Sequence, residues 1–161
     1  MLSRRRDDGQ LTLLVIGYVA IAVMLLVVGV DASKVFLARR ALSSAADAAA
    51  LAAAQAVDRA ALYRGDGDPC ADRLPLDPAV ASDAATASLA DDLESIRSVV
   101  AITAPARTAV DSGRVTVHVD GTVRVPFGRV LSVLGSRYAG GAVPIAVEAH
   151  AESALSAPPG C

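Results

Sequence analysis

Aromatic residues are scarce in this sequence, and tryptophan is absent. Aromatics make up 3% of the chain while hydrophobic residues make up 53%, so the apolar content is mainly alanine, valine and leucine. An excess of either charge is also missing, because 15 basic and 17 acidic residues leave a net charge of −2. A DNA-binding face usually needs a clear basic excess, so we expect no nucleic-acid partner.

Side-chain combinations that build chemical sites are missing too. His118 and His150 alternate with apolar neighbours, which predicts surface positions on the polar side of strands. No serine or cysteine stands in a recognisable nucleophile motif, and no glycine pair forms a phosphate loop. The acidic turn of Asp91, Asp92 and Glu94 supplies too few converging oxygens for a cation. We therefore expect no enzyme activity, no cofactor, no bound metal and no small-molecule substrate.

Charged side chains are absent from residues 11–30, which read LTLLVIGYVAIAVMLLVVGV. At ~1.5 Å per residue, this run spans ~30 Å as a helix, which matches the hydrocarbon core of a bilayer. A buried core helix is one alternative, but the run has no polar face to present to solvent. A cleaved secretory signal is another, but its apolar core would be only about 7–15 residues long. Residues 11–30 therefore predict one transmembrane helix.

Basic residues flank the predicted span on both sides and nearly balance. Three arginines at positions 4–6 precede it, and Lys34, Arg39 and Arg40 follow it, so the positive-inside rule decides little. Both cysteines lie in the C-terminal part, which favours an oxidising location for that part. We expect a single-pass protein of the cell membrane, with a cytoplasmic tail at residues 1–10 and an extracytoplasmic C-terminal domain.

Helix breakers are missing beyond the span as well, because neither glycine nor proline occurs between Gly29 and Gly65. The transmembrane helix is therefore expected to continue through residues 31–63, ending near Tyr63, as one rod ~80 Å long. Small side chains let helices approach closely, so the alanine-rich part predicts packing against a helix of the same chain or of a neighbour. The alternative is a solvated helix. The predicted packing face, called the alanine face below, comprises Ala45, Ala46, Ala49, Ala52, Ala53 and Ala56.

The part after the rod predicts an α+β head over residues 78–155. A loop at 64–77 precedes it, and Asp77-Pro78 resembles an N-cap with proline at the first helical position. Helical spacing of apolar residues predicts an amphipathic helix over 78–97. Strands are expected at 99–103, 114–125 and 143–151, with a helical turn over 127–134 and a tail at 156–161. Helices followed by strands favour a small antiparallel sheet of three or four strands covered by helix.

One dipeptide within the longest strand resembles a hairpin turn. Asp120-Gly121 is a common turn sequence, but a turn there would mix valines and polar residues on both faces. A continuous strand keeps every valine of 115–125 on one side, so we expect no hairpin, and Gly121 is a candidate bulge.

The two cysteines are expected to form a disulfide. Cys70 lies in the loop after the rod and Cys161 in the tail, and both belong to the part placed outside the cytoplasm. An unpaired thiol there is a liability. The alternative is two unrelated cysteines.

The N-terminal third also resembles a known family. Asp8-Gly9 leads into the apolar run, Gly29-Val30-Asp31 closes it, and Arg40-Ala41-Leu42 and AADAAALAAA (residues 45–54) follow. This order resembles the N-terminal region of TadE/TadG-like proteins of bacterial Flp (tight-adherence, Tad) pilus systems, over roughly residues 7–56. The residues that carry the resemblance are Gly9, Asp31, Asp47 and Leu51.

The resemblance implies a minor pilin-like or pilus-assembly component of a surface pilus or related secretion system. It implies other small pilin-like proteins and an inner-membrane platform with a secretion ATPase as partners, beside the lipid bilayer. It also implies a possible prepilin-peptidase site between Gly9 and Gln10, although Leu14 stands where such substrates carry glutamate. Ser43-Ser44 departs from the Leu-Gln that the family usually has. The alternative function is a membrane-anchored binding module whose head holds a ligand or cell-wall component.

Overall fold

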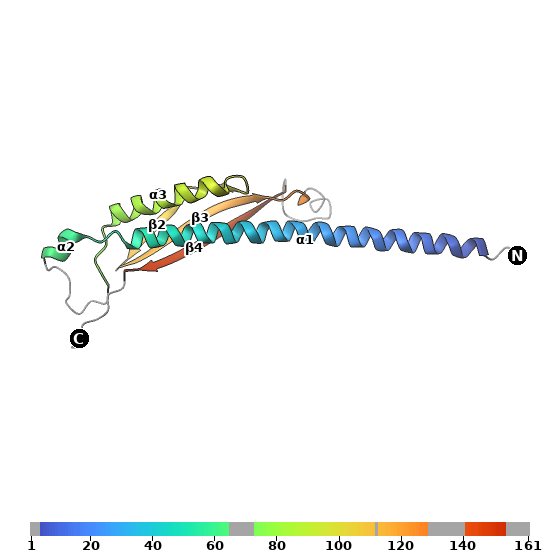
Figure 1. Cartoon of the computed structure of the whole chain (residues 1–161), viewed down its shortest axis with the longest axis horizontal. Helices are drawn as coiled ribbons and strands as arrows, with labels where there is room; N and C mark the ends of the chain where they lie inside the picture. The colour runs from blue at the N-terminus through green and yellow to red at the C-terminus, as the bar shows by residue number, and fades with distance from the viewer. Residues whose placement is uncertain (1–3, 65–72, 112, 129–140, 154–161) are drawn as a thin grey trace, which may run out of the picture.

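The computed structural model describes residues 4–64, 73–111, 113–128 and 141–153, and shows an α+β protein on a long helix (Figure 1). The helices are α1 (Arg4–Ala54), α2 (Arg59–Arg64) and α3 (Pro78–Ile96). The strands are β1 (Val100–Ile102), β2 (Arg107–Asp111), β3 (Arg114–Arg124) and β4 (Ala142–Glu152). The N-terminal half of α1 projects alone from the head, and its C-terminal half lies along the sheet. The expected fold class is confirmed.

Helix α1 ends at Ala54, so the expectation of one rod to Tyr63 is wrong. The chain turns at Gln55–Asp58 and pairs with the segment before α3, where Asp58 N donates to Pro75 O at 2.9 Å and Asp77 N donates to Ala56 O at 3.0 Å. The Asp58 carboxylate then accepts from Ala61 N at 2.9 Å and caps α2. Pairing with a distant segment therefore replaces the helical hydrogen bonds. The turn at residues 55–58 itself contains neither glycine nor proline.

Helix α3 begins as the sequence predicts. Asp77 is its N-cap and accepts hydrogen bonds from Ala79 N and Val80 N at 2.9 and 3.2 Å. Pro78 occupies the first turn, where its missing N–H costs nothing. Ala81, Ala85 and Leu89 form the buried side of α3, and this side packs against α1, which runs in the opposite direction.

The sheet is antiparallel and has β3 at its centre. Strand β4 pairs with the whole length of β3, from Arg114↔Glu152 to Arg124↔Ala142. Strands β1 and β2 share the other edge end to end, pairing with opposite halves of β3. The edge position of β4 accommodates Pro144, which has no N–H to donate to a further strand.

The core lies between one face of this sheet and the two long helices. Along β3, the odd-numbered valines are buried and the intervening residues are more exposed. The absence of a hairpin at Asp120-Gly121 is confirmed, but the candidate bulge at Gly121 is wrong. Gly121 pairs regularly with Ile145 and Ile102, and a Cβ there would lie 2.9 Å from Val100 Cγ1. Glycine at this position therefore allows side chains of β1 to approach the backbone of β3 closely. The turn expected over 127–134 lies mostly outside the described residues.

Candidate functional site

The projecting half of α1 is an apolar helix that nothing in the head covers. Among the described residues, α1 is the one helix long and apolar enough to cross a membrane. Its large side chains from Leu11 to Leu26 are all exposed, around the whole circumference of the helix. Exposed apolar surface of this extent is unfavourable in water and favourable in lipid. This feature supports the membrane anchor expected from the sequence.

The alanine face lies inside the head. Ala45, Ala46, Ala49, Ala53 and Ala56 are buried, and Ala52 is half-buried. The five buried alanines belong to the hydrophobic core shared with α3 and the valines of β3. Packing against a helix of the same chain accounts for this face, and these buried alanines are not available to a neighbouring molecule.

The other side of the same helix faces away from the head. Asp47 and Leu51 are exposed there, with Leu51 at 60%. Phe36 and Leu37 continue this exposed side toward the anchor, at 66% and 61%. An apolar surface that remains after folding is available for a partner or for the lipid interface.

Asp31 lies where the anchor meets the head and is 4% exposed. Its Oδ1 accepts a long hydrogen bond of 3.4 Å from Phe127 N. A groove of about 570 Å³ adjoins it between α1 and the end of the sheet. We call this the Asp31 groove. Its apolar lining includes Val28, Val35 and Phe36 from α1 and Val125 and Val143 from the sheet side, and Arg39 also lines it.

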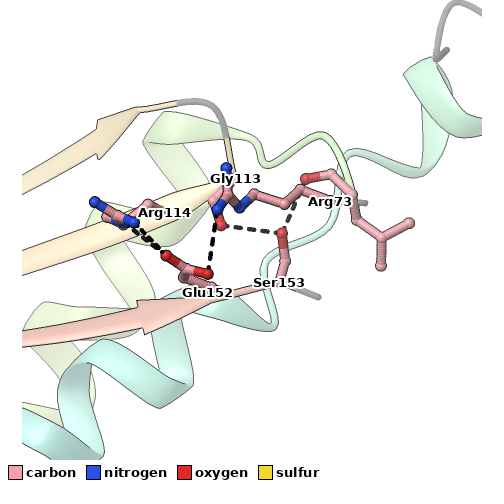
Figure 2. A network of polar contacts seen from close by, with 6 residues as sticks. Arg73, Gly113, Arg114, Glu152 and Ser153 are labelled. Carbon is pink, nitrogen blue, oxygen red and sulfur yellow. Dashed lines mark hydrogen bonds and ion pairs between the residues drawn. The ribbon is translucent and has the colours of Figure 1, made fainter. Parts of the chain in front are cut away.

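The opposite end of the head is closed by a polar network (Figure 2). Glu152 pairs with Arg114 at 2.6 Å and with Arg73 at 3.3 Å. The buried Ser153 hydroxyl lies 3.0 Å from Leu74 O and 3.2 Å from Gly113 O. Hydrogen bonding to Arg114 and the charge of Arg73 lower the pKa of Glu152. These contacts, called the distal clamp below, join three segments that are distant in sequence.

The predicted disulfide lies outside the described residues, since neither Cys70 nor Cys161 is among them. Described residues close in sequence to each cysteine do meet, because Leu74 N donates to Ser153 O at 3.0 Å. The bridge stays a prediction.

The two histidines lie on the sheet face away from the helices. Glu148 Oε1 lies 3.3 Å from His150 Nε2 and 3.6 Å from His118 Nε2. The described residues contain no group of three or more His, Cys, Asp or Glu side chains arranged to hold a metal ion.

The sequence did not single out the Asp31 groove as a site. Asp31 was noted as the residue that closes the apolar run, but its partner Phe127 is 96 residues away. The available signal was helical spacing, because Val28, Asp31, Val35 and Arg39 recur at intervals of three and four residues. Gln10, beside the possible processing site, is exposed within α1.

A comparison with protein families confirms the resemblance. Residues 9–56 match the family model described as "Putative Flp pilus-assembly TadE/G-like". The match covers under a third of the chain and almost coincides with α1. No curated protein and no solved structure matches significantly. The region similar to this family therefore lies on a helix whose apolar half projects from an α+β head.

Proposed function

We propose that this chain is a membrane-anchored minor pilin-like or pilus-assembly component of a Tad/Flp-type surface pilus or related secretion system. The observation that carries the proposal is the coincidence of the matched region with α1. That helix joins an exposed apolar segment to the core of the head. The role is structural, without catalysis.

The expected location follows from the same helix. Residues 11–30 cross the cell membrane, the N-terminus is cytoplasmic, and the head stands outside the cytoplasm. From there the head is within reach of other small pilin-like proteins, and the N-terminal tail is within reach of an inner-membrane platform with its secretion ATPase. The exposed side of α1, with Leu51 and Phe36, offers apolar surface for such contacts.

Deletion and complementation test this role. Cells lacking the protein are expected to lose surface pili in electron micrographs, and the full chain is expected to restore them. A matched chimera would replace residues 9–30 by an unrelated transmembrane helix of equal length and leave the head intact. A pilus role predicts that this chimera reaches the membrane but restores few pili.

The same experiment separates the alternative of a binding module. A binding module depends on its head and tolerates any anchor, so the chimera would retain function. Normal pili in the deletion strain would contradict the proposed role. Changes in the alanine face cannot make this distinction, because that face is part of the core of the head.

A further inference from the structure

A buried carboxylate at the junction of anchor and head lacks a partner for one oxygen. Asp31 Oδ2 is buried and has no hydrogen-bond partner among the described residues. Among the described residues, the other oxygen is within hydrogen-bond distance of Phe127 N alone, at 3.4 Å. A buried charge without a counter-charge is strongly unfavourable, so a cation placed beside it gains much of the lost electrostatic energy.

The groove beside this carboxylate is lined mainly by apolar side chains. Val28, Val35, Val125 and Val143 give it apolar walls, and it adjoins the outer end of the predicted span. Arg39 lies eight residues beyond Asp31 on the same side of α1, ~12 Å along the axis. The groove therefore suits an apolar helix segment that brings a positive charge to the level of Asp31.

The chain itself carries such a charge at this level. Lys34 is exposed and lies one turn beyond Asp31, ~4.5 Å along the axis. All copies anchored through residues 11–30 have the same depth and direction in the bilayer. A neighbouring copy thus presents Lys34 close to the level of Asp31, and the long lysine stem spans the remaining offset.

We propose that the Asp31 groove receives helix α1 of a second copy of this chain, whose Lys34 ammonium pairs with Asp31. Lys34 projects ~60° to one side of Asp31 and the centre of the groove lies to the other side, given ~100° per residue. Donor and acceptor surfaces therefore differ, the contact is heterologous, and the pair of copies retains one free Asp31 groove and one free Lys34 surface. This contact between copies requires that α1 is anchored in a bilayer. It does not require the proposed pilus role, so normal pili in the deletion strain would contradict that role and not this contact.

Photo-crosslinking in native membranes tests this contact. Full-length protein carrying benzoylphenylalanine at Phe36 would be produced together with a differently tagged second copy. We expect an adduct between the two copies that mass spectrometry maps near residue 34. An adduct with lipid alone, or with a different protein, would overturn the assignment of a second copy.

Charge variants provide the second readout. Asp31→Asn keeps the acceptor for Phe127 N and removes the charge, and Lys34→Gln changes an exposed side chain. Each is expected to reduce the adduct about fivefold or more, because charge pairs at such contacts contribute strongly to association. The exchange of both residues, Asp31→Lys with Lys34→Asp, is expected to recover it.

Arg97→Gln is the matched control, since Arg97 is exposed at the end of α3 and does not line the groove. It is expected to leave the adduct unchanged. Unchanged adduct in both Asp31→Asn and Lys34→Gln would overturn the proposal.

Discussion

At the scale of single residues, the buried face of β3 contains one position where no side chain fits. Gly121 lies among buried valines, and a Cβ there would approach Val100 Cγ1 to 2.9 Å and Ala101 O to 3.3 Å. Overpacking of a filled core costs about 1–3 kcal/mol. We expect Gly121→Ala to destabilise the head by that amount in thermal unfolding followed by circular dichroism. Ala109→Val, which also enlarges a side chain but at an exposed position of β2, is the control and should change little.

Glu152 in the distal clamp predicts a pH-dependent contribution to stability. Its folded-state pKa lies below the ordinary value because of Arg114 and Arg73. The ion pairs therefore stabilise the fold at neutral pH, and this contribution is lost as the pH falls through the folded-state pKa. Glu152→Gln should lower the urea midpoint at neutral pH, and its difference from the wild type should shrink in acid. An equal difference at both pH values would contradict this account, and Glu94→Gln, on α3, is the control.

Asp31 illustrates what sequence reasoning reaches at this scale. Its place after 20 uncharged residues identified the end of the anchor. Its burial depends on Phe127 and on Val125 and Val143, which no local pattern connects to it. Helical or strand periodicity does not predict contacts between residues about 96 positions apart in sequence. The Asp31 groove could therefore be identified only from the three-dimensional structure.

At the scale of elements, the alanine face determines how closely α1 and α3 approach. Ala49 and Ala53 are fully buried in the core, so a larger side chain at either position must displace a helix or the sheet. We expect Ala49→Leu or Ala53→Leu to cost about 1–3 kcal/mol or more and to increase proteolysis of the head. Leu51→Ala, on the exposed side of the same helix, is the control. Unchanged protease resistance in both leucine variants would show that the alanine face is not packed.

Strong periodic patterns predicted their elements well. The capped helix α3 and the long strands β3 and β4 were predicted to within about two residues. The end of α1 and strand β2 were not. Alanine propensity favours helix beyond Ala54, but hydrogen bonds to residues 75–77 prevail there. Strand β2, Arg107–Asp111, has no fully buried residue and is defined by its pairing with β3.

At the scale of the whole molecule, the distal clamp joins the two described segments that lead toward the cysteines in sequence. Neither cysteine is among the described residues, which stop at Arg64, resume at Arg73 and end at Ser153. Leu74 and Ser153 are hydrogen-bonded to each other. A Cys70–Cys161 bridge would close a loop of about 90 residues and stabilise the fold by roughly 4–5 kcal/mol before strain. Intact protein from native membranes should resist thiol labelling until it is reduced. Full labelling of both cysteines without reduction would contradict the bridge.

The central claim is that α1 has one half in the bilayer and one half in an extracytoplasmic head. Cysteine accessibility scanning tests it most directly, in a chain with Cys70 and Cys161 replaced by serine and single cysteines placed along the helix. In intact cells with a permeable outer layer, a membrane-impermeant maleimide should label position 51, which is exposed outside the bilayer, and position 63 in α2. It should not label positions 16, 21 or 26, which lie within the apolar run. Labelling of these three positions in full-length protein, or protection of 51 and 63, would contradict the account.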